Sequence, residues 1–518
     1  MAFRRQWWLA AGIGAAAVVV VVTIVLAEQP SGSGSASASG SPSGDGNAGL
    51  VSLSAAPLGV NTAPWDDLYS TSSANVMQPL LAAAGIKQLR YGGGAYADLY
   101  DWQTNTDIGN CLPDNTTASF TSKCSATDVL DFAQFSQRAR AIGADSLVTV
   151  NYGSGTPALA AAWVTAAERN ASEHVALWEV GNETYGCWEV NNELDTSPAD
   201  YAGYVINTND TCPMVSEGLD AGMETMATSY AAHAKQFITA MRAVDPKALI
   251  GVPYAFGPDV GGAQVGDAAE WNNVVLGEDA KYISFVDVHY YPEAFGGSAG
   301  GANPTNQEIL QSLFKVPALY KEVRTELNAT DPTAGIVVGE TGVTYLATTI
   351  PCTPAGALFS AGDALSWLAA GARGVDWWTM NAYGNTGSKC VNPDEGMFTS
   401  SAKPAIDTYY TGYLLASALA QPSAKLAALA TSDPANVMAW QSTLANGKTA
   451  VAFINTNTTA AQTVTFKSAL SGTLTKVSYS AGNQNAAKTK TVTTKITAKS
   501  LANGIVLPAQ SMIVLKES

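Results

Sequence analysis

Two apolar runs in this sequence end in carboxylates. Residues 176–183, ALWEVGNE, close on Asn182 and Glu183, and residues 335–342, GIVVGETG, carry Glu340 near their end. Removing an ionised carboxylate from water costs several kcal/mol unless a partner compensates, so such groups are seldom placed at buried strand ends without a role. Two facing carboxylates can divide a reaction between them, because one donates a proton while the other attacks a carbon centre. The sequence therefore suggests catalysis by a glutamate pair.

The elements that would position this pair form a repeating pattern of short apolar runs and amphipathic segments. Segments such as 127–143 and 224–244 read as helices, with Ser, Thr or Asp near their starts and Gly near some ends. Eight such strands alternating with helices predict a (β/α)8 TIM barrel over residues 50–420, with a doubly wound sheet as the alternative. Polar residues gather at the strand ends, which favours the barrel. The eight runs are 57–61, 86–92, 146–153, 176–183, 248–255, 284–291, 335–342 and 374–381.

In such a barrel Glu183 closes the fourth strand and Glu340 the seventh, on opposing walls. A retaining glycosidase needs two carboxyl groups about 5–5.5 Å apart, one protonated and one ionised. Each glutamate taken alone could equally form an ion pair with a nearby Lys or Arg. Their joint position on opposing strands favours the catalytic interpretation.

Arg90 ends the second strand and is the candidate partner of these acids. Its guanidinium could hold Glu340 ionised, or it could neutralise Glu179, or it could do both. Strand alternation predicts that Glu179 and Glu183 point to the same side of the fourth strand, into the barrel.

Further residues near strand ends are candidate sugar contacts. Asn151 could bind a hydroxyl or simply cap a loop. A tyrosine at the end of the sixth strand could hydrogen-bond the nucleophile or pack with its hydroxyl in water. Either Trp377 or Trp378 could stack on a sugar while the other packs outward, whereas Trp65 and Trp102 are weaker stacking candidates and more typical of core packing. The candidates are Trp65, Asn151, His289, Tyr290, Tyr291 and Trp378.

Four segments carry a resemblance to a known family. LRYGGGAYADLYDW (89–102), VTVNYGSGTPALAAAWV (148–164), WEVGNETYGCW (178–188) and VDVHYYPE (286–293) resemble the α-L-arabinofuranosidases of glycoside hydrolase family 51, in clan A. The resemblance covers most of residues 57–380. It implies that Glu183 is the acid/base, that Asn182 contacts the sugar 2-hydroxyl, and that Glu340 is the nucleophile.

Two departures from that family keep other activities open. Gly92 stands where the family usually has Pro, and Gly339-Glu340-Thr341 replaces its Asp-Glu-Trp-like motif. The Gly-Glu-Thr sequence is closer to other clan A branches. The expected function is therefore an exported retaining arabinofuranosidase acting on a polysaccharide or oligosaccharide. A β-glycosidase or β-glucuronidase, or a non-catalytic carbohydrate-binding surface protein, is the alternative.

Charge and glycine patterns exclude several other classes. The chain has 43 acidic and 27 basic residues, a net charge of −16, which disfavours nucleic acid as a partner. GGGAYA (92–97) resembles a dinucleotide-binding loop only superficially, since no clear helix follows it and no acidic residue ends the next strand. No cofactor is expected.

The N-terminus predicts export. Arg4 and Arg5 precede an apolar run from Trp7 to Ala27, so residues 1–27 are either a cleaved signal peptide or an uncleaved membrane anchor. Residues 28–49 read as a disordered Gly/Ser/Ala linker. The remainder is expected to be extracellular, either secreted or anchored to the cell membrane.

Six cysteines in an exported chain indicate disulfides. Proximity in sequence favours the pairs Cys111–Cys124, Cys187–Cys212 and Cys352–Cys390, all in loops on the predicted catalytic face. No metal site is expected, because there is no Cys-x-x-Cys and the three histidines are scattered. Tied loops of this kind predict a pocket that releases single sugars, although they could equally serve to resist proteases.

The C-terminal part has a different pattern. Residues 421–518 contain runs that alternate in period two, separated by turn residues, which predicts an accessory antiparallel β-sandwich. Residues 49–56 could contribute one of its strands. No catalytic cluster occurs there.

Overall fold

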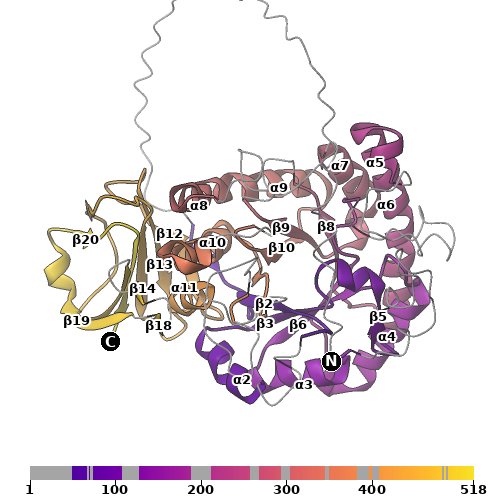
Figure 1. Cartoon of the computed structure of the whole chain (residues 1–518), viewed down its shortest axis with the longest axis horizontal. Helices are drawn as coiled ribbons and strands as arrows, with labels where there is room; N and C mark the ends of the chain where they lie inside the picture. Colours follow the sequence, from indigo (N-terminus) through magenta and orange to yellow (C-terminus); the bar gives the residue numbers. More distant parts are fainter. Residues whose placement is uncertain are drawn as a thin grey trace, which may run out of the picture. The chain divides into compact units, whose positions relative to one another are not determined.

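Eight parallel strands form a closed barrel (Figure 1). The computed structural model describes residues 49–66, 69, 74–107, 128–187, 189, 212–256, 268–292, 304–344, 349–381, 396–398, 408–480, 484–485, 488–489 and 491–518. Around the barrel the strands are β2 (Leu58–Thr62), β3 (Gln88–Tyr91), β6 (Asp145–Val150), β7 (Leu177–Val180), β8 (Ile250–Tyr254), β9 (Phe285–Tyr290), β10 (Gly335–Thr341) and β11 (Val375–Trp377). Closure through the pairing of β11 with β2 confirms the TIM barrel and excludes the doubly wound sheet.

Helices connect the strands and surround the barrel. Helix α3 shows why they form where they do: Asp131 and Gln134 make a reciprocal capping box at its start, and Gly143 ends it with φ +62°. The helices are α2 (Ala74–Ala83), α3 (Phe132–Ile142), α4 (Pro157–Arg169), α5 (Pro213–Ser216), α6 (Leu219–Val244), α7 (Ala268–Asp279), α8 (Asn306–Ser312), α9 (Val316–Thr330), α10 (Pro354–Ala370) and α11 (Thr408–Ala416). Across the described ranges, no helix combines the length and apolarity needed to cross a membrane.

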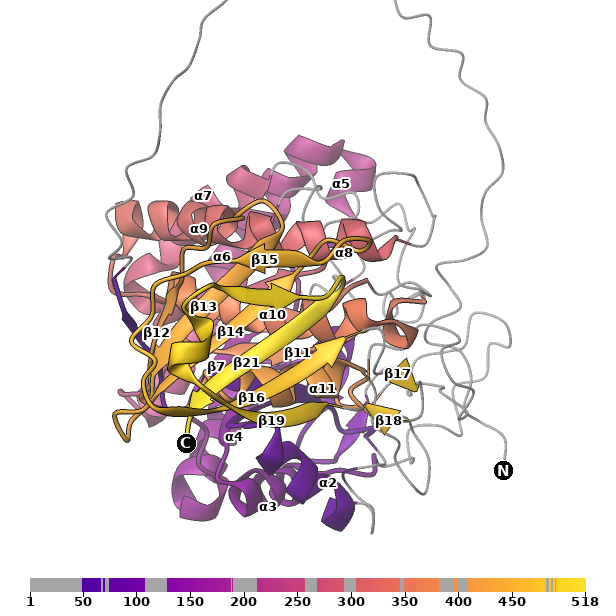
Figure 2. The same cartoon turned by 90° about the vertical axis from the view of Figure 1, so that its left-hand side faces the viewer.

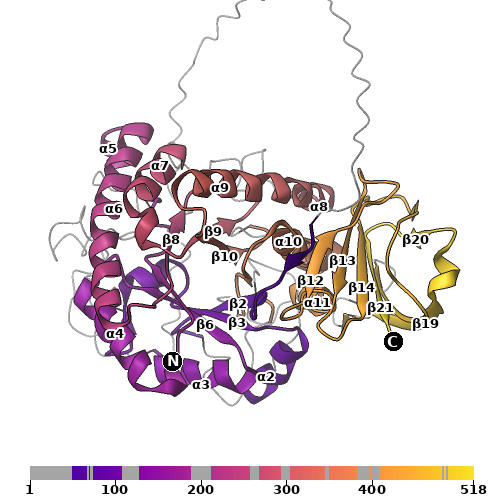
Figure 3. The same ribbon diagram turned by 180° about the vertical axis from the view of Figure 1, so that it is seen from behind.

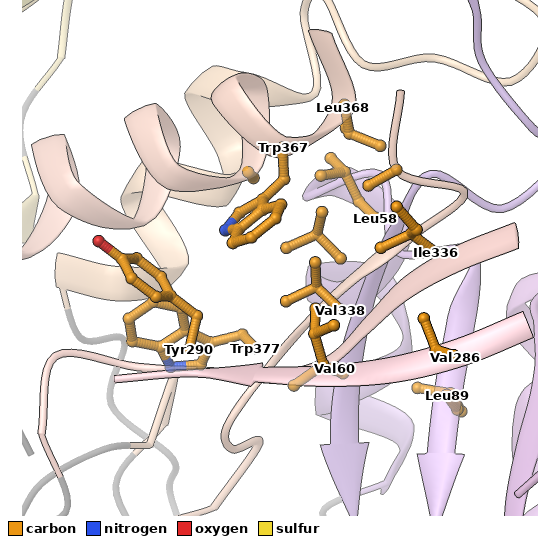
Figure 4. Close-up of a cluster of buried hydrophobic side chains, with 14 of the residues drawn as sticks. Leu58, Val60, Leu89, Val286, Tyr290, Ile336, Val338, Trp367, Leu368 and Trp377 are labelled. Atoms are coloured by element: carbon orange, nitrogen blue, oxygen red, sulfur yellow. The ribbon is translucent and has the colours of Figure 1, made fainter. Parts of the chain in front are cut away.

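Side chains alternate along the strands, which separates an apolar outer layer from a polar interior. On β2, Leu58 and Val60 face the helices, while Gly59 and Asn61 face the barrel axis. Figure 4 shows the outer layer, in which Trp367 and Leu368 of α10 lie over side chains of β2, β9 and β10. This layer fixes the strands, and thereby the polar side chains that they carry inside.

The C-terminal residues form an antiparallel sheet of seven strands with a smaller sheet over it. The order is β1 (Val51–Ser52), β12 (Lys425–Ala428), β13 (Val437–Thr443), β14 (Thr449–Asn455), β21 (Ser511–Glu517), β16 (Thr473–Ser480) and β19 (Val492–Thr497). The second sheet pairs β15 (Gln462–Val464) with β20 (Ile505–Leu507), on the far side of the large sheet from α10 (Figure 3). Strand β1 lies in the segment 49–56 and pairs with β12. This confirms the prediction that residues 49–56 contribute a strand to the C-terminal sheet.

Helix α10 joins the barrel to this sheet. Fifteen of its residues, from Pro354 to Leu368, are buried, because one side packs on the barrel and the other on the sheet. A helix that is apolar around its whole circumference is expected only where it has no solvent-facing side. Residues 49–518 accordingly form one compact unit. The predicted leader, residues 1–27, lies outside the described residues, as does the predicted linker except for Gly49.

A buried carboxyl low in the barrel gives a prediction about stability. Asp376 on β11 accepts a hydrogen bond from Gln88 Nε2 at 2.7 Å, and burial raises its pKa to about 8. The native state therefore binds a proton that the unfolded chain releases near pH 4, so this contribution to stability is lost as pH rises from about 4 to about 8. Each pH unit in that window corresponds to about 1.4 kcal/mol at most.

We expect Asp376→Asn, which keeps the acceptor for Gln88 but cannot ionise, to flatten this dependence. The free energy of unfolding, measured in urea at pH 5 and pH 8, should fall less for the variant than for the wild type, by roughly 1–4 kcal/mol. Asp220→Asn, at an exposed position of α6, is the control. Parallel pH profiles for Asp376→Asn and the wild type would contradict the assignment.

Candidate active site

Arg90 lies at the centre of the polar interior. Its side chain is fully buried and donates to Glu179 from Nε (3.1 Å) and Nη2 (2.8 Å), to Glu340 from Nη1 (2.6 Å), and to Asn182 Oδ1 from Nη2 (2.9 Å). Asn61 accepts a further bond from Nη1 at 3.0 Å. Both partners predicted for Arg90 are therefore present. One guanidinium holds two carboxylates in a single orientation.

Glu340 points inward because β10 carries a bulge. Val338 pairs with Val288 of β9, but Glu340 pairs with His289, so Gly339 is an extra residue that reverses the side to which Glu340 points. A Cβ on Gly339 would overlap the carboxylate of Asp287, which explains the glycine. Thr341 then faces outward and donates to Asp363 of α10 at 2.9 Å. Each residue of the Gly-Glu-Thr sequence thus has a place in the bulge: Gly339 fits beside Asp287, Glu340 points inward, and Thr341 bonds to α10.

Glu183 lies beyond the end of its strand. Strand β7 ends at Val180, and Gly181 and Glu183 have φ of +76° and +41°. The strand alternation that predicted a common side for Glu179 and Glu183 therefore stops before Glu183, and a turn places its carboxylate. A non-glycine residue in this region of φ costs on the order of 1 kcal/mol or more, which surrounding contacts must offset. One contact is the bond from Gly186 N to Glu183 O, at 2.7 Å.

His289 stands between the two glutamates. Its Nδ1 is 2.8 Å from Glu183 Oε1 and 3.5 Å from Glu340 Oε2, and one oxygen of each glutamate lies within 4.8 Å of the other. Burial by itself lowers the pKa of His289, but the charge of Glu340 and hydrogen bonds to Asp287 and Glu183 raise it well above the usual value. These charges and hydrogen bonds therefore favour the protonated form of the imidazole.

The acids behind this pair differ in the direction of their pKa shifts. Burial raises the pKa of Glu179 to about 8 against the opposing effect of Arg90. Burial also acts to raise the pKa of Asp287, but hydrogen bonding and charge from His289, together with Arg90, hold it below its usual value. Asp287 also fixes the bulge by accepting from Gly339 N at 2.5 Å. The same carboxylate thus positions the histidine and the strand that carries Glu340.

Glu189 is a site residue that the sequence analysis missed. It is buried, and its Oε1 accepts from Asn182 Nδ2 at 2.9 Å, while Arg90 donates to the other side of the same amide. Burial, followed by the nearby charges of Asp98 and Glu183, raises its pKa well above the usual value. No strand pattern marks Glu189, because only the turn after β7 brings it back to the amide.

We expect Glu189→Ala to lower kcat/KM roughly ten- to hundredfold, since a buried hydrogen bond that orients Asn182 is lost. Glu189→Gln should remain close to wild type, because the amide still offers Asn182 an acceptor. If Asn182 contacts the 2-hydroxyl as the resemblance implies, the loss of kcat/KM caused by Glu189→Ala should largely disappear on a 2-deoxy glycoside. Equal penalties on both substrates would assign Glu189 to general stability instead.

Tyr291 and Tyr290 have opposite orientations. The hydroxyl of Tyr291 donates a hydrogen bond to Glu340 Oε2 at 2.8 Å. One of the two alternatives for a tyrosine at the end of the sixth strand predicted such a bond. Tyr290 points away from the mouth, where its hydroxyl donates to Ser312 O at 3.1 Å and its ring packs against Trp367. The prediction that Tyr290 contacts substrate is therefore wrong, because strand alternation turns it toward the helices.

The neighbouring tryptophans Trp377 and Trp378 also point to opposite sides of the barrel wall. Trp377 packs outward against Tyr409, with ring centroids 4.5 Å apart. Trp378 faces the mouth, with 8% of its surface exposed, and its ring lies directly against Gly93 and Gly94, where a Cβ would be less than 3 Å away. Gly93 and Gly94 therefore make room for an indole.

The remaining candidates are less directly placed. The amide of Asn151 bonds Tyr100 O and Ser154 Oγ through Nδ2 and accepts from Ser154 N and Gly155 N, which favours the loop-cap alternative over a sugar contact. Trp65 lies half-buried in the turn after β2, and its role in stacking stays a prediction. Trp102 stacks on Trp163 at 5.5 Å, as core packing requires.

One disulfide closes the loop that follows β7. Cys187 and Cys212 are bonded, with Cα atoms 5.8 Å apart, which confirms this pairing. The predicted bonds Cys111–Cys124 and Cys352–Cys390 involve side chains outside the described residues.

Among the described residues, two groups of side chains have the spacing of metal ligands. Glu179, Asp287 and His289 form one, and Glu183, His289 and Glu340 the other, each with ligand atoms within 4.8 Å. Arg90 already lies against three of these acids, with Nε 3.6 Å from Asp287 Oδ2. A divalent cation there would meet a fixed positive charge, so the donor set does not fit a resident metal.

Comparison with solved structures identifies the architecture. The fold is similar to an α-L-arabinofuranosidase from Thermotoga maritima (TM-score 0.63, 16% identity, 91% of this chain and 98% of that one). It is also similar to the GH51 arabinofuranosidase from Xanthomonas axonopodis pv. citri (TM-score 0.60, 17% identity, 90% of this chain and 97% of that one). A third similar structure is the 4-O-α-L-rhamnosyl-β-D-glucuronidase from Fusarium oxysporum 12S (TM-score 0.60, 16% identity, 92% of this chain and 99% of that one).

No protein-family model and no curated protein sequence matches the chain. At these identities the likeness concerns the fold, which extends through both the barrel and the C-terminal sheet. The chain therefore has the fold of the clan A glycoside hydrolases and is structurally similar to the GH51 arabinofuranosidases.

Proposed function

We propose that the protein is a retaining glycoside hydrolase with Glu340 as nucleophile and Glu183 as acid/base. The observation that carries the proposal is the approach of Glu183 and Glu340 oxygens to within 4.8 Å across the barrel mouth. That separation suits direct attack on an anomeric carbon, whereas an inverting enzyme keeps its carboxyl groups about 6.5–9.5 Å apart to admit a water. Arg90 and Tyr291 hydrogen-bond the carboxylate of Glu340 and hold it in one orientation.

The chemistry follows from these contacts in two steps. Glu340 attacks the anomeric carbon while Glu183 gives its proton to the leaving oxygen, and Glu183 then deprotonates the water that releases the sugar. His289 bonds to Glu183 and faces Glu340, so it can stabilise whichever carboxylate is ionised at each step. The cluster behind the pair stays fixed throughout.

The substrate that we propose is an α-L-arabinofuranoside in a polysaccharide. The structural similarity to several GH51 arabinofuranosidases supports it. A β-glucuronidase is the second candidate, because the Fusarium glucuronidase is similar over as much of the chain and Gly-Glu-Thr departs from the GH51 nucleophile motif.

A panel of aryl glycosides tests the proposal. We expect hydrolysis of 4-nitrophenyl α-L-arabinofuranoside with retained configuration, followed by NMR of the first-formed anomer. Turnover of the β-glucuronide instead would favour the second candidate. Binding of sugars without turnover of any substrate would indicate a carbohydrate-binding protein and contradict the enzymatic proposal.

We further propose that the enzyme acts outside the cell and is held at the membrane by residues 1–27. The apolar run from Trp7 to Ala27 is long enough to span a bilayer, which supports this proposal. Detergent should be needed to extract the protein from cells. A mature N-terminus at Glu28, with activity in the culture fluid, would show a cleaved signal peptide.

A further inference from the structure

Charge is divided very unevenly along this chain. Residues 421–518 contain nine lysines, no arginine and two acidic residues, a net charge of +7. The preceding 420 residues contain 18 basic and 41 acidic residues, a net charge of −23. The C-terminal sheet unit is therefore basic within an acidic protein, a difference that the total of −16 conceals.

The two acidic residues of this unit are occupied by internal contacts. Glu517 accepts from Thr449 N and from the amide and hydroxyl of Ser471, at 2.7–2.8 Å. Asp433 accepts from Asn436 Nδ2 at 3.1 Å. Among the residues that the structure describes in this unit, no lysine forms an ion pair with either of them. The lysines thus produce a positive potential that their own unit does not neutralise.

A pocket of about 270 Å³ lies on the face of the sheet that is turned away from α10. It is bounded by the segment after β15 and by the 3-10 helix Ala498–Leu501, and its lining includes Phe466, Lys467, Ser468 and Leu501. The ring of Phe466 is held against Phe453, with centroids 4.6 Å apart. The pocket therefore presents an aromatic ring, a hydroxyl and an ammonium group. Figure 2 shows this side of the unit, with β15 near the viewer.

Two more lysines lie on the same face. Lys499 belongs to the 3-10 helix that borders the pocket and is exposed. Lys476 of β16 pairs with Leu515, whose side chain belongs to the same apolar cluster as Phe466 and Leu501, so Lys476 projects on this side of the sheet. Lys467, Lys476 and Lys499 thus lie on the face of the sheet that carries the pocket.

We propose that this face binds a carboxylate-bearing polysaccharide, with one sugar in the pocket and its acidic groups near the three lysines. An aromatic ring with adjacent hydroxyl and amine donors suits a single sugar ring better than a flat lipid surface or a nucleic-acid duplex. The strongly acidic barrel is repelled by a polyanion, and the basic sheet supplies the compensating attraction. The unit thereby holds the barrel on an acidic glycan at a site separate from the catalytic mouth.

The test uses the full chain with Glu340→Gln, so that binding is measured without turnover. We expect binding to polygalacturonate by affinity electrophoresis, little binding to neutral arabinan, and a loss of at least fivefold between 20 and 200 mM NaCl. Adding Lys467→Gln, Lys476→Gln and Lys499→Gln should weaken binding to polygalacturonate at least tenfold. The same triple substitution in the otherwise wild-type chain should leave turnover of aryl glycosides unchanged, which keeps this test independent of the catalytic proposal.

The matched control changes charge equally on the barrel, through Lys247→Gln, Lys315→Gln and Lys321→Gln, three exposed residues. Equal weakening by both triple variants would overturn the proposal, as would unaltered binding by the first. Equally tight, lysine-dependent binding of duplex DNA would also overturn it, because it would show general attraction of polyanions. Melting temperatures of both variants confirm that they are folded.

Discussion

Glu340→Gln should lose roughly four or more decades of kcat/KM on every glycoside that the protein hydrolyses. The amide cannot form the covalent glycosyl-enzyme, and no other described carboxylate lies where it could replace Glu340 without losing its own contact to Arg90 or His289. A 2-fluoro glycoside with a good leaving group should label the wild type, and mass spectrometry of a digest should find the label on the peptide that contains Glu340.

Glu179→Gln is the matched control for this experiment. Glu179 shares Arg90 with Glu340, so its substitution disturbs the same guanidinium without removing the nucleophile. Its loss of activity should be much smaller, and the label should still attach to Glu340. Label found only on another peptide, with Glu340→Gln still active, would remove Glu340 from the mechanism.

Glu183→Ala should show a loss that depends on the leaving group. Natural glycosides need protonation of a poor leaving oxygen and should lose roughly 10²- to 10⁴-fold, whereas activated nitrophenyl glycosides should retain far more of their rate. Azide should restore turnover and yield a glycosyl azide, because the small anion enters the space beside His289 that the carboxylate leaves.

Glu183→Gln tests the same role with the space filled. It removes the proton donor but leaves no room for azide, so the leaving-group dependence should persist while rescue by azide disappears. Equal losses on good and poor leaving groups in both variants would falsify the acid/base role of Glu183.

The barrel could be predicted because eight apolar runs alternate with amphipathic segments and polar residues gather at the ends of these runs. Within β2, Leu58 and Val60 pack outward while Asn61 points inward, as a period of two requires. The strand ends were less predictable: the expected strand 176–183 ends at Val180, and 374–381 is reduced to Val375–Trp377. Backbone conformations with positive φ, as at Gly181, end a strand without any change in hydrophobic pattern.

Side-chain direction at the strand ends depended on features that hydrophobic pattern does not reveal. Glu340 points inward only because of the extra residue at Gly339, and Glu183 only because of a turn. The sequence could not distinguish the neighbours Tyr290 and Tyr291, and strand alternation turned Tyr290 toward the helices and Tyr291 toward Glu340. Glu189 lay in no recognisable motif.

The sequence by itself determined the kind of fold, the two glutamates at opposing strand ends, and their arginine, because residue type and period are local properties of the chain. Only the tertiary structure decided which charges share a partner: it placed Arg90 between Glu179 and Glu340, His289 between Glu183 and Glu340, and Glu189 against Asn182. These contacts join residues up to 250 positions apart. Their protonation states follow from burial among one another, which exists only once the barrel has closed.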